Sequence, residues 1–191
     1  MTLLLLGILV FFSVHSVRIF AEDWRTRQIA ARGERAWRGI YSLVSVVGIV
    51  MVGAGYARMR RAPVEVWTPP DWTFPFTSAL MLVSFVLVAA AYVRGNRIKA
   101  KIGHPMTAGV MVWAIAHLLS NGTLGDMLLF GAFLVWAVFA FIEARRRDRV
   151  AGTTYPLGPV ARDVTMVILG AAAWFAFGFW LHGPLIGVQP F

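Results

Sequence analysis

The stretch FTSALMLVSFVLVAAAYV, residues 76–93, contains no charged side chain. A helix that crosses the hydrocarbon core of a bilayer needs roughly 20 mostly apolar residues. Similar stretches precede and follow this one, so we expect an all-α integral membrane bundle of about six transmembrane helices. It should form a single transmembrane domain over residues 1–191. The predicted helices lie near residues 2–21, 39–57, 76–94, 106–120, 124–144 and 163–182.

The overall composition favours the same class of protein. Hydrophobic residues make up 59% of the 191 residues and charged residues only 14%, whereas a soluble domain carries about 25% charged residues. The formal net charge is +9, but the basic residues lie beside apolar stretches. We therefore interpret them as orientation signals and contacts for anionic lipids, and we expect no nucleic-acid partner. The chain has no cysteine, which excludes disulfides, thiolate metal ligands and cysteine nucleophiles.

The basic residues also predict an orientation. They flank the first, third and fifth connections, apart from Arg58, Arg60 and Arg61 beside the second. Positive charge marks the cytoplasmic side, so both termini should face the periplasm or exterior. No Lys or Arg precedes the first apolar stretch, and we expect it to be a retained helix rather than a signal peptide. The segment from Glu22 to Arg38 is predicted to be either an interfacial stretch or a solvated loop.

The four histidines are the main candidates for function, because ionisable residues inside a membrane are costly. His15 and His117 lie inside predicted helices, His104 precedes the fourth helix, and His182 ends the sixth. At 1.5 Å per residue, His15 and His117 lie roughly 12 and 20 Å from the cytoplasmic side, and His182 roughly 29 Å. His15 and His117 could therefore share one haem b as axial ligands. The alternative is that each histidine only hydrogen-bonds a neighbouring carbonyl or hydroxyl group.

Residues near the two histidines suit a haem site. Arg18 lies one turn from His15 and could pair with a propionate. Gly109 leaves room for a flat ring, and Trp113 could pack against it. The chain has no CxxCH sequence, so the haem would be bound non-covalently. Three acidic residues are expected at the interfaces without forming a carboxylate pair: Asp126, Glu143 and Asp163.

Motifs along the whole chain resemble those of the NnrU family. The first motif is His15-Ser16 with Arg18. The central motif begins with Gly103-His104-Pro105 and continues through Trp113-Ala114-Ile115-Ala116-His117 to Gly122 and Leu129-Phe130-Gly131. The last motif is Leu181-His182-Gly183-Pro184-Leu185-Ile186-Gly187-Val188.

This resemblance implies a function and a cofactor. Bacterial members of the NnrU family are associated with denitrification and nitric oxide metabolism, in the cytoplasmic membrane. Their plant relatives are the 15-cis-zeta-carotene isomerases, which use haem b. The axial histidines of those enzymes fall on motif positions that are His15 and His117 in this chain. The plant motif has Cys where this chain has Ala114, so ligand exchange with a thiolate cannot occur here.

We consider three functions. The first is a haem b protein with redox or cis–trans isomerase activity, acting on nitric oxide or a small lipophilic substrate. The second is a methyltransferase that binds S-adenosylmethionine near His104, Arg97 and Lys99. The His-Pro element resembles that of membrane methyltransferases, although Gly103 replaces their Arg and no glutamate pair lies near Glu143. The third is a non-catalytic factor that assembles with a reductase or with a second copy of itself.

Overall fold

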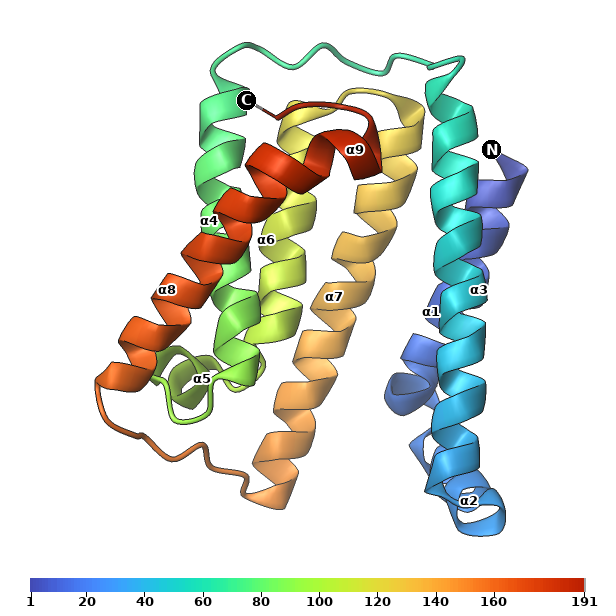
Figure 1. Ribbon diagram of the computed structural model, residues 1–191. Coiled ribbons are helices and arrows are strands. Elements are labelled where there is room, and N and C mark those ends of the chain that lie inside the picture. The colour runs from blue at the N-terminus through green and yellow to red at the C-terminus, as the bar shows by residue number, and fades with distance from the viewer. Residues whose placement is uncertain (191) are drawn as a thin grey trace. The chain divides into compact units, whose positions relative to one another are not determined.

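The computed structural model describes residues 1–190, which are helical apart from turns and connections. Within them there is no extended strand, and Glu65 and Thr123 form an isolated β-bridge. Figure 1 shows the helices in chain order. They are α1 Thr2–Phe20, α2 Glu22–Arg32, α3 Glu34–Arg60, α4 Thr73–Tyr92, α5 Arg97–Ile102, α6 Pro105–Ser120, α7 Leu124–Ala151, α8 Ala161–Ala176, the π-helical turn η1 Phe177–Leu181, and α9 His182–Ile186.

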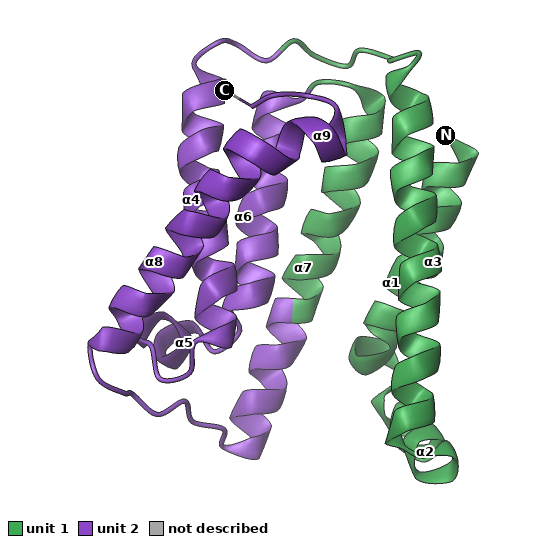
Figure 2. Ribbon diagram, in the orientation of Figure 1, with its two compact units in different colours: residues 1–68, 122–140 green, residues 69–121, 141–191 purple. Residues whose placement is uncertain are grey.

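The chain divides into two compact units (Figure 2). Unit 1 consists of Met1–Thr68 and Gly122–Ala140, and unit 2 of Pro69–Asn121 and Phe141–Phe191. Helix α7 therefore contributes its first part to unit 1 and its second part to unit 2. The single domain expected over the whole chain stays a prediction.

Five helical segments are long and apolar enough to cross a membrane: α1, α3, α4, α7 and the continuous run Ala161–Ile186. Many of their large apolar side chains are exposed, as in Leu43 at 66% and Val50 at 63% on α3, which suits contact with lipid. Helix α6 has only 16 residues, or roughly 24 Å at 1.5 Å per residue. All six predicted helices are thus present, and the chain is a multi-pass membrane protein with one short helix.

Several helices extend beyond the predicted boundaries. Helix α3 begins at Glu34 rather than near residue 39, and α7 continues to Ala151 rather than ending near residue 144. Hydropathy marks where a helix leaves the hydrocarbon, whereas Arg, Glu and Ala continue a helix readily into water. The predicted interfacial segment is also mostly helical, because α2 occupies its first part and Gly33, with φ of 82°, separates α2 from α3.

Unit 1 depends on close backbone contact between α1 and α3. A Cβ atom added to Gly48 would lie 2.7 Å from the backbone nitrogen of Phe11, and one added to Gly7 would lie 2.5 Å from that of Val52. Small residues allow such an approach, which is a common basis of helix association in lipid. This packing fixes the helix that carries His15.

In unit 2, α4 packs against both α6 and α8. The buried Ser84 hydroxyl donates to the carbonyl of Gly109 at 2.8 Å, and the Thr77 hydroxyl donates to that of Ala116 at 3.0 Å. On the other side of α4, a Cβ on Gly170 would lie 2.6 Å from the Cα of Val86. These contacts fix the helix that carries His117.

Replacing Gly48 with alanine should destabilise the α1–α3 pair, because the methyl group has no space beside Phe11. We expect Gly48→Ala to lower the free energy of unfolding by about 1–3 kcal/mol. Gly53→Ala on the same helix is the matched control, since nothing lies within 4 Å of its added Cβ atom. Thermal unfolding in detergent compares the two; equal melting temperatures would contradict the packing described.

The cysteine-free chain also permits a test of orientation. A cysteine in place of Thr68, in the second connection, should react with a membrane-impermeant maleimide in intact cells. A cysteine in place of Thr154, in the fifth connection, should react only after the cells are permeabilised. The reverse labelling pattern would overturn the orientation predicted from the basic residues.

Candidate functional site

His15 of α1 lies in an aromatic environment within unit 1. Its Nδ1 atom is 2.7 Å from the carbonyl oxygen of Phe11. A carbonyl can only accept, so Nδ1 carries the proton and Nε2 carries the lone pair. The imidazole stacks on the Phe11 ring with centroids 3.9 Å apart. Its centroid also lies 5.1 Å from that of Tyr41 and 5.8 Å from that of Trp136.

His117 of α6 has the same local arrangement within unit 2. Its Nδ1 atom is 2.9 Å from the carbonyl oxygen of Trp113, one turn earlier, so Nε2 again carries the lone pair. The Trp113 and His117 ring centroids are 5.2 Å apart. If each histidine served only as a hydrogen-bonding partner within its own helix, this bond from Nδ1 to a backbone carbonyl would be expected. This bond uses Nδ1 of each ring, so the lone pair lies on Nε2 in both histidines.

The remaining residues predicted for the haem site have contacts of their own. Arg18 is largely exposed, and its Nε atom lies 3.9 Å from a carboxylate oxygen of Glu22. Gly109 faces α4, where an added Cβ would lie 3.1 Å from the carbonyl oxygen of Ser84. Because His15 belongs to unit 1 and His117 to unit 2, their pairing stays a prediction, as do the roles of Arg18, Gly109 and Trp113. Within residues 1–190, no group of three or more His, Asp or Glu side chains could hold a metal ion.

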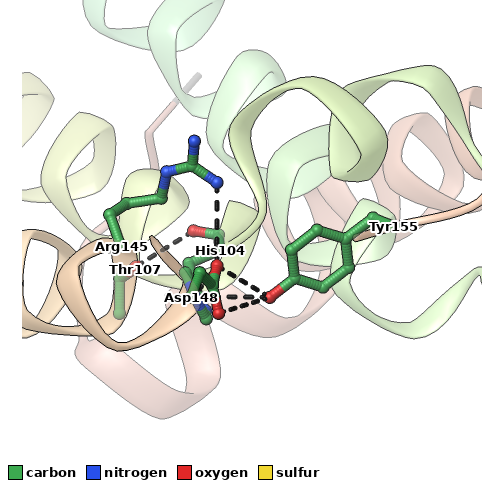
Figure 3. Close-up of polar contacts among 5 residues, drawn as sticks. All are labelled: His104, Thr107, Arg145, Asp148 and Tyr155. Carbon is green, nitrogen blue, oxygen red and sulfur yellow. Dashed lines mark hydrogen bonds and ion pairs between the residues drawn. The ribbon is translucent and has the colours of Figure 1, made fainter. Parts of the chain in front are cut away.

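A second polar site surrounds His104, which occupies the N-cap position of α6. Figure 3 shows that neighbouring side chains converge on the carboxylate of Asp148. The Nε2 atom of His104 lies 2.9 Å from Oδ2 of Asp148, and the Tyr155 hydroxyl donates to the same oxygen at 3.0 Å. Nη1 of Arg145 lies 3.6 Å from it. The cluster belongs entirely to unit 2 and joins α6, α7 and the connection after α7.

Local backbone geometry explains why these residues meet. Gly103 has φ of 76°, and an added Cβ would lie 2.7 Å from Nη1 of Arg145 and 3.1 Å from the Tyr155 ring. Only glycine combines this backbone conformation with so little space. The backbone N–H of Thr153 donates to the carbonyl of Asp148 at 2.9 Å, which directs the connection back toward α6.

The electrostatics of the cluster favour a structural role. Partial burial and the hydrogen bond to Asp148 raise the pKa of the Tyr155 hydroxyl above its ordinary value, so Tyr155 is a neutral donor at physiological pH. His104 points its Nε2 atom at Asp148 rather than at a cofactor. Arg97 pairs with Asp163, and the Lys99 ammonium donates to the carbonyl of Ala91 at 2.8 Å. All three side chains considered for S-adenosylmethionine therefore bond to protein groups.

Two buried or helical carboxylates are not evident from the hydropathy pattern. Asp148 was placed beyond the end of α7, although Arg145 and Asp148 have the i, i+3 spacing of a helical ion pair. Asp126, expected at an interface, lies in the first turn of α7 and is only 4% exposed, so its carboxylate is buried among protein groups. It accepts hydrogen bonds from the Tyr56 hydroxyl at 2.5 Å and from the Thr123 hydroxyl at 2.6 Å. The sequence Thr123-Leu124-Gly125-Asp126 has the spacing of a helix-capping box and could have indicated the contact with Thr123, although not the one with Tyr56.

Comparison with known proteins gives one match. The family model described as NnrU protein matches residues 3–190, nearly the whole chain. No curated protein and no solved structure matches the chain.

Removing the Tyr155 hydroxyl tests the cluster. We expect Tyr155→Phe to lower the free energy of unfolding by about 1 kcal/mol at neutral pH, because one hydrogen bond to Asp148 is lost. The folded-state pKa is raised, so the hydroxyl contributes fully below the ordinary value of about 10 and loses its contribution as the pH rises through the folded-state pKa. The melting temperatures of wild type and Tyr155→Phe should therefore converge as the pH rises through the folded-state pKa of Tyr155. Tyr92→Phe, at an exposed tyrosine, is the control; an equal effect of both changes would contradict the role of the cluster.

Proposed function

The chain belongs to the NnrU family, and on that premise we propose that it is a haem b protein of the bacterial cytoplasmic membrane. His15 and His117 are the residues that would hold the haem. The proposed physiological role is in nitric oxide and nitrogen-oxide metabolism, through a redox reaction or a cis–trans isomerisation. The resemblance of its motifs to those of the NnrU family supports the role in nitrogen-oxide metabolism.

The shared tautomer of His15 and His117, combined with their position inside the apolar helices α1 and α6, carries this proposal. In both residues Nδ1 donates to the carbonyl four positions earlier, so Nε2 is the basic nitrogen. Histidines that bind metals usually donate their other N–H to a carbonyl or carboxylate, which fixes the ring and raises its basicity. His104 differs, because its Nε2 atom is directed at Asp148.

An unsatisfied polar atom beside His15 also fits a bound group. The indole Nε1 of Trp136 is buried and has no hydrogen-bond partner within residues 1–190. Leaving such a donor unpaired costs about 1–3 kcal/mol, and an acceptor on a bound molecule would remove that cost. Phe11, Tyr41 and Trp136 surround the imidazole and limit the access of water to it.

The chain's own residues have defined tasks in this proposal. His15 and His117 would hold the haem, and the carbonyls of Phe11 and Trp113 accept from Nδ1 and orient the two imidazole rings. Arg18, which already lies near Glu22, would neutralise a propionate at the end of α1. Bound haem would supply an iron centre that changes oxidation state and binds small ligands. No second function is proposed, because His104, Arg97 and Lys99 are all engaged with protein groups.

Absorption spectra of the detergent-purified protein test the proposal. The wild type should give a low-spin haem b spectrum that sharpens on reduction with dithionite. His15→Ala and His117→Ala should each lose the haem or become high-spin, because one axial ligand is removed. His182→Ala is the matched control, since His182 has the same kind of bond, from Nδ1 to the carbonyl of Val188, and should keep the wild-type spectrum.

Circular dichroism and gel filtration of each variant separate loss of haem from loss of fold. A wild-type protein that stays colourless after expression with added haemin would overturn the proposal. So would an unchanged low-spin spectrum in both His15→Ala and His117→Ala.

A further inference from the structure

Helix α2 is tied to the two spans of unit 1 at both of its ends. A single residue separates it from α1, and a single glycine separates it from α3. Gly7 of α1 approaches Val52 of α3. Phe11, further along α1, approaches Gly48, which lies earlier on α3, so the two helices are antiparallel. The end of α1 and the start of α3 therefore reach the same side of the bilayer, and α2 connects them there (Figure 1).

The reach of α2 away from the bilayer is short. Its 11 residues rise roughly 16 Å. Contact between Trp24 and Trp37, with ring centroids 5.8 Å apart, packs α2 against the first turn of α3. Trp24 is 45% exposed, and Phe20 at the end of α1 is 77% exposed. Tryptophan is enriched where lipid headgroups meet the hydrocarbon, so these features favour a position of α2 in the headgroup layer.

The segment from Arg18 to Arg38 carries excess positive charge. It contains six arginines and three carboxylates, which leaves a formal net charge of +3. Glu22 accepts a hydrogen bond from Arg25 at 3.0 Å and lies 3.9 Å from Arg18. Glu34 accepts one from Arg38 at 2.6 Å. Ion pairs inside the protein thus neutralise only part of this charge.

Three arginines of the segment have no carboxylate partner in the part of the chain that the structure describes: Arg27, Arg32 and Arg35. All three side chains are exposed, two of them on α2 and the third in the first turn of α3. Asp23, the third carboxylate of the segment, pairs with none of them in that same part. Guanidinium groups bind phosphate through paired hydrogen bonds. The missing partner is therefore an anion that reaches the membrane surface.

The short connections of α2 decide between the possible anions. The phosphate of a phospholipid lies in the same layer as the helix, whereas an acidic protein from the aqueous phase would have to displace headgroups to reach it. A zwitterionic lipid brings a positive charge of its own, which the excess of arginine repels. An anionic phospholipid brings none, and its attraction grows with each basic residue near the surface.

We propose that Arg27, Arg32 and Arg35 form a binding surface for the headgroups of anionic phospholipids, of which phosphatidylglycerol is the test case. Bound headgroups hold α2 at the interface. Of the two alternatives for the segment from Glu22 to Arg38, the proposal selects the interfacial stretch over the solvated loop. It goes beyond the proposed function and does not depend on bound haem.

Fluorescence quenching at α2 tests the proposal on the full-length protein in phosphatidylcholine vesicles. The chain has no cysteine, so Thr26→Cys at an exposed position of α2 takes a single bimane label. The vesicles contain a small, equal fraction of either phosphatidylglycerol or phosphatidylcholine with a nitroxide on the acyl chain near the headgroup. We expect labelled phosphatidylglycerol to be enriched at Thr26 at least about fivefold over labelled phosphatidylcholine. Raising the ionic strength from about 0.01 M to about 1 M should bring this ratio close to one, because charges at the surface are then screened.

Replacing Arg27, Arg32 and Arg35 together with glutamine should also bring the ratio close to one. Replacing Arg58, Arg60 and Arg61 with glutamine is the matched control, because it removes the same charge from the opposite end of α3 and should leave the ratio unchanged. Circular dichroism of both variants verifies their fold.

Equal quenching by the two lipids in the wild type would overturn the proposal, as would an unchanged ratio after loss of Arg27, Arg32 and Arg35. A label that neither lipid quenches would also overturn it, since α2 would then lie in the aqueous phase, where only a soluble partner could neutralise the arginines. His15→Ala should keep the enrichment after losing its haem, so this proposal and the proposed function can fail separately.

Discussion

The absence of water in the hydrocarbon core is the constraint on which the rest of this structure depends. Each polar group placed there needs a partner from the protein itself. The hydroxyls of Thr77 and Ser84 meet carbonyls of α6, and Asp126 accepts from Tyr56 and Thr123. An exception to this pairing is informative for the same reason, and the buried indole N–H of Trp136 on α7 is one, because it has no hydrogen-bond partner within residues 1–190.

Close helix packing follows from the same constraint. Lipid tails are as apolar as leucine side chains, so apolar surface alone gives little drive for helices to associate. Glycines instead let backbones touch, as at Gly48 on α3 and Gly170 on α8. The polar cluster at Asp148 adds a hydrogen bond between His104 and Asp148, where Gly103 lets α6 begin beside α7. The helices that carry His15 and His117 are therefore held by backbone contact and by internal hydrogen bonds.

Hydropathy alone was sufficient to place the apolar helices and to put His15 and His117 inside them. An apolar span is recognised from the composition of its own residues, without information on the segments it contacts. The motifs identified the family for the same reason.

The extension of α7 to Ala151 was missed because arginines end an apolar stretch without ending a helix. The contact of Asp148 with His104 and Tyr155 depends on that extension and on the backbone conformation of Gly103. The burial of Asp126 depends on Tyr56, seventy residues away in sequence, and no local pattern reports such a contact.

The short length of α6 has a consequence for the bilayer around it. Its 16 residues rise roughly 24 Å, against a hydrocarbon thickness of roughly 30 Å. Such a hydrophobic mismatch is relieved by local thinning of the membrane, which brings headgroups and water inward at the ends of the helix. His117 lies within one turn of the end of α6 at Ser120. Protons and small polar solutes therefore travel a shorter distance through hydrocarbon to reach His117 than to reach a residue at the same place on a full-length span.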